Sequence, residues 1–294
     1  MRPDHWVKNL LILPGFVLGL NFVALHVSQI PDLIITFIGA SLAASANYTI
    51  NEYLDRTFDS HHPRKKQRRS VLGKVTLKGI VVQYLILSAS AIILFLSINV
   101  SSFLICVLFL TNGLIYNLPS IRLKEKKYLD IFSESFNSPL RLAWGWYSLV
   151  VNPFPPSSAL IAFWLTGIFL MALKRYVELS EFSTVAEAKA YRVSLSSYSK
   201  IQLIRIAMMS SFSAAMLMGI YIIRNRIEFI IVLPFVVWIF SEFTVAAIDG
   251  GKIIHSPETM VKSKKIFTAL VTLSLLACIL YFVDIPILSD VLRK

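Results

Sequence analysis

Charged residues and cysteines are scarce in this chain. Only 16% of its 294 residues are charged, whereas 56% are hydrophobic, and soluble domains usually carry roughly 25% charged residues. The two cysteines, Cys106 and Cys278, lie far apart in separate apolar runs, and the five histidines show no zinc-ligand spacing. The sequence therefore indicates neither a disulfide framework nor a zinc site. The low charged fraction and high hydrophobic fraction, with a mean hydropathy of +0.67, are typical of a membrane protein.

A cleavable signal peptide and a long basic stripe are also missing. The first apolar run follows Lys8 directly and ends near His26 without a small-residue cleavage pattern. The net charge of +12 is divided among the segments between apolar runs, so we expect no nucleic-acid partner. We expect a lipid bilayer instead.

Nine apolar runs have spanning or near-spanning length, which is roughly 20 residues. We therefore predict an all-α fold in a single domain, residues 1–294, with nine transmembrane helices around a cytoplasm-facing polar cavity. The last run is expected to meet lipid or another copy of the chain, as in a homo-oligomer. The runs are residues 9–28, 32–53, 77–98, 100–116, 129–151, 157–178, 201–223, 228–248 and 265–288.

Lysine and arginine are concentrated in every second connection. The segments after the second, fourth, sixth and eighth runs are rich in them, and those near Gln29, Asn99 and Asn152 have none. The positive-inside rule predicts a cytoplasmic N-terminus and an external C-terminus, which suits the inner membrane. The connection near Asn225 has two basic residues, and all the motif-bearing loops then share the cytoplasmic face, where a charged, water-soluble ligand is expected.

The first group of polar residues ends the second run. Asn47, Asn51, Asp55 and Asp59 are spaced by four, so on a helix they project from one face, and Glu52 lies beside them. Magnesium is usually held by one or two carboxylates together with substrate phosphates. We therefore predict Mg²⁺ on Asp55, Asp59 and Glu52, with Asn51 beside it.

A basic cluster that includes Lys65 and Arg68 follows in the same loop. Its cations are suitable partners for the phosphate oxygens that the metal leaves uncovered. The alternative is that Asp55 and Asp59 only solvate a helix end and pair with Arg56 or Lys65.

The fourth and fifth runs supply the second group. Tyr116 and Lys124 follow the fourth run, where Lys124 is either a phosphate ligand or a topology signal. Glu134, Asn137 and Arg141 form a polar stripe in the fifth run. A cation buried in a bilayer requires a partner, and for Arg141 this is either Glu134, in a structural pair, or a ligand phosphate.

The third group ends the sixth run. Lys174, Arg175, Tyr176 and Glu178 form a K-R-Y-x-E pattern, and Arg192 follows in the loop. Taken alone, Lys174 and Arg175 are typical of cations that extend from a helix end toward the interface.

Residues 51–59, N-E-Y-L-D-R-T-F-D, resemble the N-D-x-x-D-x-x-x-D motif of the UbiA superfamily of intramembrane prenyltransferases, with Glu52 where the pattern has Asp. The segment Tyr116 to Lys124 and Asp130 are similar to two further features of that superfamily. The second Asp-rich motif of its prenyl-diphosphate enzymes is missing after the sixth run. The K-R-Y-x-E-L run, the opening R-P-x-x-W-V-K-N with Lys8, and Asp249 followed by two glycines resemble the decaprenyl-phosphate phosphoribosyltransferase branch.

The resemblance implies a magnesium-dependent membrane transferase whose substrates are phosphoribosyl diphosphate and a polyprenyl phosphate. Magnesium would stabilise the leaving diphosphate, and lysines and arginines of the three groups would hold the other phosphates. The alternative enzyme moves an isoprenyl group from isoprenyl diphosphate to an aromatic or other small acceptor. A transporter is the third reading, but its sites are expected near the midplane rather than at one face.

Overall fold

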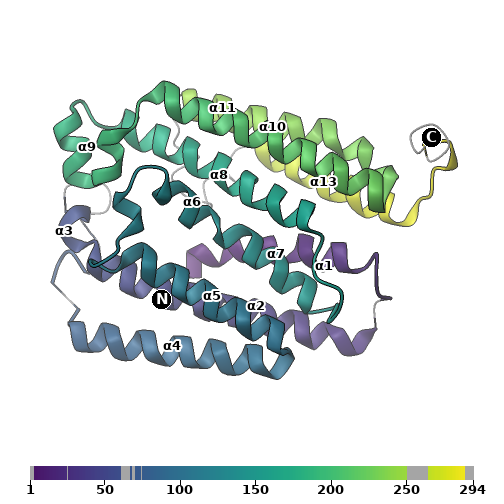
Figure 1. Ribbon diagram of the computed structural model, residues 1–294, viewed down its shortest axis with the longest axis horizontal. Helices are drawn as coiled ribbons and strands as arrows, with labels where there is room; N and C mark the ends of the chain where they lie inside the picture. Colours follow the sequence, from purple (N-terminus) through teal and green to yellow (C-terminus); the bar gives the residue numbers. More distant parts are fainter. Residues whose placement is uncertain are drawn as a thin grey trace. The chain divides into compact units, whose positions relative to one another are not determined.

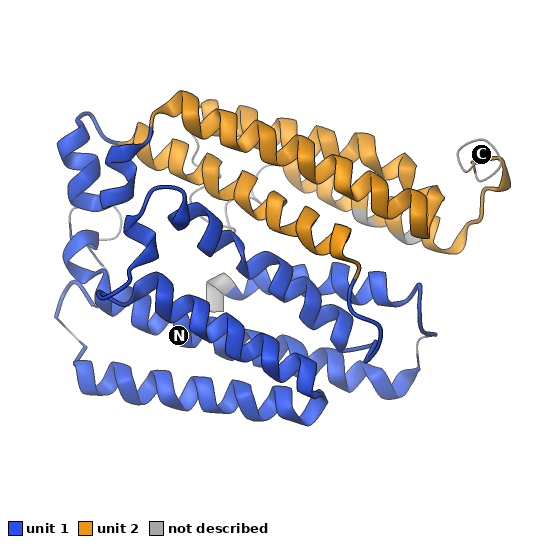
Figure 2. Cartoon of the chain, in the orientation of Figure 1, with its two compact units in different colours: residues 1–155, 182–198 blue, residues 156–181, 199–294 orange. Residues whose placement is uncertain are grey.

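The backbone is helical wherever it is regular, as the apolar runs predict. The computed structural model describes residues 3–24, 26–60, 67, 70–73, 75–249 and 264–288, and within these ranges it contains helices and no strands. The all-α prediction is therefore confirmed. The chain divides into two compact units, residues 1–155 with 182–198, and residues 156–181 with 199–294 (Figure 2). A single domain remains a prediction.

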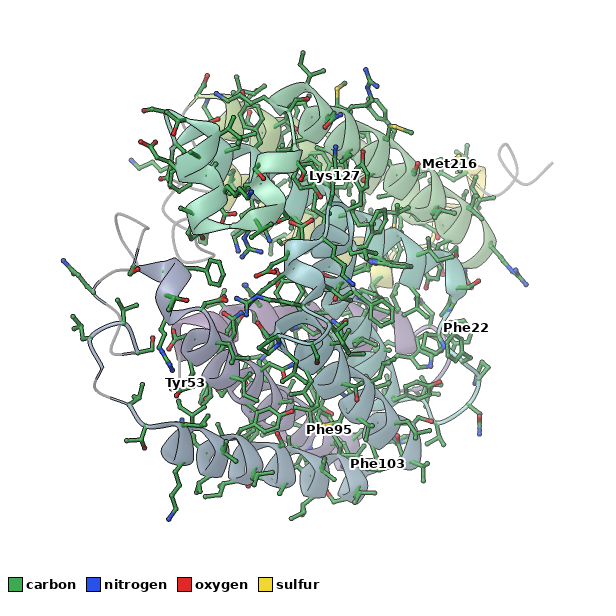
Figure 3. The ribbon with its side chains drawn as sticks, turned by 60° about the vertical axis from the view of Figure 1, so that its left-hand side comes forward. Phe22, Tyr53, Phe95, Phe103, Lys127 and Met216 are labelled. Atoms are coloured by element: carbon green, nitrogen blue, oxygen red, sulfur yellow. The ribbon has the colours of Figure 1, made fainter. Side chains whose placement is uncertain are left out.

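Unit 1 is built on three long helices that run side by side, α2, α4 and α5 (Figure 1). Buried alanines of α2, among them Ala40 and Ala43, allow close helix packing. Phe95 of α4, labelled in Figure 3, stacks on Trp144 with ring centroids 4.6 Å apart. The helices of this unit are η1 Pro3–Leu11, α1 Ile12–Gly19, η2 Val27–Gln29, α2 Ile30–Leu54, α3 Arg56–Asp59, α4 Leu77–Ile98, α5 Val100–Asn117, η4 Leu123–Glu125, α6 Leu129–Ser135, α7 Asn137–Tyr147, α9 Val185–Tyr191 and η5 Val193–Ser197.

Unit 2 contains four long helical segments. Helix α10 packs along α8, and α11 contacts α8, α10 and α13. The N-terminus of α10 is fixed by a capping box, because Ser199 Oγ accepts from the N–H of Gln202 at 3.2 Å. The segments are α8 Ser157–Ser180, α10 Lys200–Asn225, η6 Ile227–Val232 with α11 Leu233–Ile248, and α13 Lys264–Phe282.

Each predicted apolar run contains helix, but two runs differ from a full span. The first forms only the short apolar helix over Trp6–Gly19, and the fifth divides into α6 and α7. The count of nine spans remains a prediction. Seven helices in the described ranges are long and apolar enough to cross a membrane: Val27–Leu54, Leu77–Ile98, Val100–Asn117, Ser157–Ser180, Lys200–Asn225, Ile227–Ile248 and Lys264–Phe282.

The division of the fifth run has a local cause. Pro139 has no N–H for the carbonyl of Ser135, so the helical ladder is interrupted ahead of it. Side-chain amides satisfy carbonyls near the break: Asn137 Nδ2 donates to Glu134 O at 3.1 Å, and Asn112 Nδ2 of α5 donates to Ser133 O at 2.9 Å. Buried backbone carbonyls need such partners in lipid.

Helices α1 and α7 cross with their backbones in contact. A Cβ added at Gly15 would lie 1.9 Å from the carbonyl oxygen of Leu142, and one at Gly145 would lie 1.8 Å from that of Ile12. Any side chain larger than the hydrogen atom of glycine is therefore excluded at both positions. Small residues at helix crossings are a common means of close packing in membranes.

We expect Gly145→Ala to lower the free energy of unfolding by about 3 kcal/mol, because the methyl group meets backbone that cannot rotate away. Thermal unfolding in detergent measures the effect. Gly219→Ala in α10 is the matched control, since its nearest neighbour, Leu233 Cδ1, would be 3.8 Å away and alanine favours helix. Equal unfolding temperatures for the two variants would contradict the close-contact interpretation.

Candidate functional site

The predicted acidic stripe lies where α2 passes into α3. Helix α2 ends at Leu54, and Asp55 takes φ −93° and ψ 0° before α3 begins. The four-residue repeat continues across this junction, because the N–H of Asp55 donates to Asn51 O at 3.0 Å and the N–H of Asp59 donates to Asp55 O at 2.7 Å. Asp59 is buried and Glu52 is half-buried. Asn51 and Asp55 therefore remain side by side, as the spacing predicts.

Five side chains form a hydrogen-bonded group around Asp55, which we call the Asp55 cluster: Asn51, Asp55, Asn117, Arg122 and Lys124. Asn51 Nδ2 donates to Asp55 Oδ2 at 3.2 Å, Arg122 Nη2 donates to Asp55 Oδ1 at 3.2 Å, and Lys124 Nζ also donates to Oδ1. Asn117 Oδ1 accepts from Asn51 at 2.6 Å and from Lys124 at 2.8 Å. The cluster joins the end of α2 to the loop after α5.

Asn47, one turn before Asn51, also faces α5. Its Nδ2 donates to Phe109 O at 3.1 Å. The side chain lies against Gly113, where an added Cβ would be 2.2 Å from it. Asn47 therefore holds α2 against α5 beneath the Asp55 cluster.

The loop that carries Arg122 and Lys124 is held in a strained conformation. Arg122 has φ +42° and Tyr128 has φ +67°, and non-glycine residues in this region cost of order 1–3 kcal/mol each. Arg122 is fixed by its ion pair with Glu125 and by the Phe58 ring, whose centroid is 4.7 Å from its Cζ. These contacts hold the strained loop in the conformation in which Arg122 and Lys124 both reach Asp55.

Lys124 is buried, and this changes its chemistry. Burial lowers the pKa of Lys124 to about 8, with Asp55 acting in the opposite direction and the Arg122 and Arg192 charges lowering the pKa further. An ammonium group that is so poorly hydrated gains strongly from a second anionic partner. Lys124 is buried and bound to Asp55, whereas a lysine that only marks the cytoplasmic side of the membrane would be solvated.

A third cation reaches this region from the segment that contains α9 and η5. Arg192 Nη1 donates to Tyr116 Oη at 3.2 Å. The Tyr116 ring centroid is 5.9 Å from Lys124 Nζ. Tyr116 is therefore a shared neighbour of Arg192 and of Lys124 in the Asp55 cluster.

The buried Arg141 of α7 donates hydrogen bonds to neutral groups and also interacts electrostatically with the Glu134 carboxylate. Its Nε donates to Asn9 Oδ1 at 2.9 Å, its Nη1 donates to Asn137 O at 3.0 Å, and its Cζ is 5.1 Å from the Phe109 ring centroid. Asn9 lies 132 residues away in sequence, so spacing gives no sign of this bond. Lys8 Nζ lies 5.8 Å from the Tyr48 ring centroid.

The predicted residues of α8 and α11 belong to unit 2. Arg175 is fully buried, and its Nη1 donates to Glu178 Oε2 at 2.6 Å, one turn along α8, with Lys174 half-buried beside it. Tyr176 is half-buried, and Asp249 is exposed at the end of α11. Lys65 and Arg68 lie outside the described residues.

The donor set at Asp55 fits magnesium rather than a softer metal. In the described part of the chain no three His, Cys, Asp or Glu side chains gather as a metal cage. The oxygen atoms of Asp55 and Asp59, with Asn51 beside them, match an ion that takes one or two protein carboxylates and completes its shell with water and phosphate. In this structure both carboxylate oxygens of Asp55 accept hydrogen bonds, Oδ2 from Asn51 and Oδ1 from Arg122 and Lys124.

Asn117 and Arg122 belong to the cluster but were not among the predicted site residues. Asn117 directly follows the predicted site residue Tyr116 at the end of α5, and this position in the sequence could have indicated it. Arg122 reaches Asp55 only through its left-handed backbone conformation, for which a non-glycine residue gives no sequence signal.

The sequence matches the UbiA prenyltransferase family over residues 12–243. A decaprenyl-phosphate phosphoribosyltransferase of Mycobacterium tuberculosis is 30% identical over 228 residues, 75% of this chain and 72% of that protein. A 4-hydroxybenzoate octaprenyltransferase of Vibrio parahaemolyticus is 36% identical over 99 residues, 34% of this chain. The chain thus spans about a third (35%) of the length of that relative.

Solved structures agree on the fold. A UbiA homolog from Archaeoglobus fulgidus bound to GPP and Mg²⁺ has a TM-score of 0.67 at 17% identity, with 94% of each chain covered. A digeranylgeranylglyceryl phosphate synthase has a TM-score of 0.58 at 18% identity, covering 94% of this chain and 91% of the other. The resemblance seen in the motifs is confirmed. This multi-pass membrane chain belongs to the UbiA prenyltransferase family.

Proposed function

We propose that the chain transfers a 5-phosphoribosyl group from phosphoribosyl diphosphate to a polyprenyl phosphate and releases diphosphate. The observation that carries this proposal is the gathering of three fixed cations, among them the buried Lys124, at and beside Asp55. Lys124 and Arg122 share one carboxylate, and Arg192 adjoins them. A donor that carries a diphosphate and a further phosphate requires more cations than an isoprenyl diphosphate does.

The sequence of α8 supports the same donor. Where the prenyl-diphosphate enzymes of the superfamily have a second Asp-rich motif, this chain has Lys174 and Arg175, and Glu178 is bound to Arg175. The mycobacterial phosphoribosyltransferase matches over most of both chains. Arg175 is fully buried and its charge is balanced by Glu178, so the support from α8 lies in its sequence pattern.

Each group of residues has one task in this reaction. Asp55 and Asp59 would hold Mg²⁺, which when bound stabilises the charge of the departing diphosphate. Lys124, Arg122 and Arg192 bind the phosphate oxygens. The bond from ribose C1 to the diphosphate oxygen breaks, and C1 bonds to an oxygen of the polyprenyl phosphate. That oxygen is already anionic, so no strong general base is needed and catalysis consists of positioning and charge stabilisation.

The proposal places the Asp55 cluster and the N-terminus on the cytoplasmic side of the inner membrane, in a polar cavity. The connections rich in Lys and Arg support this orientation. A soluble polyanion and a lipid with an anionic head meet at that boundary.

A second candidate is transfer of an isoprenyl group to an aromatic acceptor. The local match to the Vibrio 4-hydroxybenzoate octaprenyltransferase favours it. The same Asp55 site would then hold an isoprenyl diphosphate, and the cations from Lys124 and Arg192 would remain its phosphate partners.

Purified chain in detergent, given labelled phosphoribosyl diphosphate and polyprenyl phosphate, is expected to form a phosphoribosylated lipid with Mg²⁺ and none with a chelator. Parallel reactions contain an isoprenyl diphosphate and 4-hydroxybenzoate. Product only in the parallel reactions would replace the first proposal with the second. A chelator-insensitive product would remove the metal from both.

A further inference from the structure

The fully buried Asp130, in the first turn of α6, joins two segments that are distant in sequence. Its Oδ2 accepts from Ser194 Oγ at 3.0 Å, and its Oδ1 accepts from Tyr198 Oη at 2.7 Å. Tyr198 Oη in turn accepts from the N–H of Tyr128 at 2.6 Å. We call these four residues the Asp130 latch.

The latch ties the loop before α6 to the segment containing α9 and η5. The Tyr128 and Tyr198 rings meet edge to face at 5.9 Å. The ammonium group of Lys127, labelled in Figure 3, lies 5.1 Å and 5.5 Å from their centroids. Tyr128 has φ +67°, so the bond from its N–H to Tyr198 also stabilises a strained corner.

Burial of Asp130 argues for a specific role. Taking a carboxylate out of water costs several kcal/mol unless hydrogen bonds compensate, and here Ser194 and Tyr198 donate two of them. Both of these donors come from one short segment, 64 and 68 residues away. Docking of that segment therefore supplies two hydrogen bonds that compensate the buried carboxylate. Since it is fully buried, Asp130 is not placed to touch a substrate.

Arg192 lies between α9 and η5 in the same docked segment, two residues before Ser194, and donates to Tyr116 beside Lys124. We propose that Asp130 is a positioning residue, which through Ser194 and Tyr198 holds Arg192 against Tyr116 as the third cation for the donor diphosphate. The inference rests on the proposed function, because it assigns Arg192 to the anion site of that reaction.

Two serines of η5 provide a matched pair of variants. Ser194 Oγ donates to Asp130, whereas Ser196 Oγ donates to Val193 O within its own turn. We expect Tyr198→Phe combined with Ser194→Ala to weaken binding of Mg²⁺ with inorganic diphosphate about tenfold, measured by titration calorimetry on the full chain in detergent. Ser196→Ala is expected to leave the affinity unchanged.

The Arg192→Gln background separates positioning from general damage. Arg192→Gln alone is expected to weaken diphosphate binding, and adding the two latch substitutions is expected to weaken it no further, because the cation that they position is gone. An equal further loss in both backgrounds, or unchanged affinity in the latch variant, would overturn the latch inference alone. Absence of diphosphate binding by the unsubstituted chain would overturn the proposed function with it.

Discussion

Lys124→Met is expected to lower the rate of donor turnover about 100- to 1000-fold, the usual effect of removing a fixed charge that faces developing negative charge. Lys124 Nζ is buried and bound to Asp55 and Asn117. It is therefore held in place before any substrate arrives, so little of its interaction with phosphate is lost to ordering.

Steady-state kinetics with varied donor concentration measures this effect. Lys126→Met is the matched control, because Lys126 is exposed in the same loop. Lys124→Arg is expected to restore only part of the rate, since a planar guanidinium does not reproduce a compact ammonium. Activity of Lys124→Met within about threefold of the unsubstituted chain would show that this cation is not part of the anion site.

Asp55→Asn is expected to have two effects. The rate is expected to fall about a thousandfold, roughly 4 kcal/mol of barrier, because the proposed magnesium site loses a carboxylate. The free energy of unfolding falls by about 3 kcal/mol, because Lys124 and Arg122 lose their shared counter-charge in a site where Asp55 is only 13% exposed.

The two effects are measured separately, by activity of the folded fraction across Mg²⁺ concentrations and by thermal unfolding. Asp32→Asn is the matched control. It removes one carboxylate charge from the first turn of the same helix α2, far in sequence from the Asp55 cluster. A variant that unfolds earlier yet keeps its full magnesium response would assign Asp55 to folding alone.

The local order of the Asp55 cluster was predictable from sequence, and its long-range partners were not. The four-residue spacing correctly placed Asn51 beside Asp55, since a helical period fixes which side chains are neighbours. Arg122 lies 67 residues from Asp55 and reaches it through a left-handed backbone conformation. Nothing in a side chain's identity encodes such a contact, which depends on how α5 packs against α2.

In the fifth apolar run, Pro139 indicated a break in the helix, but the prediction followed the length and hydropathy of the run. Its length predicted one span, yet Pro139 removes a backbone donor, and the run divides into α6 and α7. Asn137 then donates to the backbone at the break, and the carbonyl of Asn137 accepts from Arg141. Hydropathy averages over a window and does not register the loss of a single hydrogen bond.

The glycine contact between α1 and α7 has a consequence for the beginning of the chain. With carbonyl oxygens pressed against Gly15 and Gly145, the first helix can neither slide nor turn against its neighbour. Asn9, just ahead of it, therefore keeps a constant distance to the Arg141 guanidinium. The opening residues therefore form a rigid part of unit 1, and shortening the chain past Asn9 would remove the side-chain oxygen that accepts from Arg141 Nε.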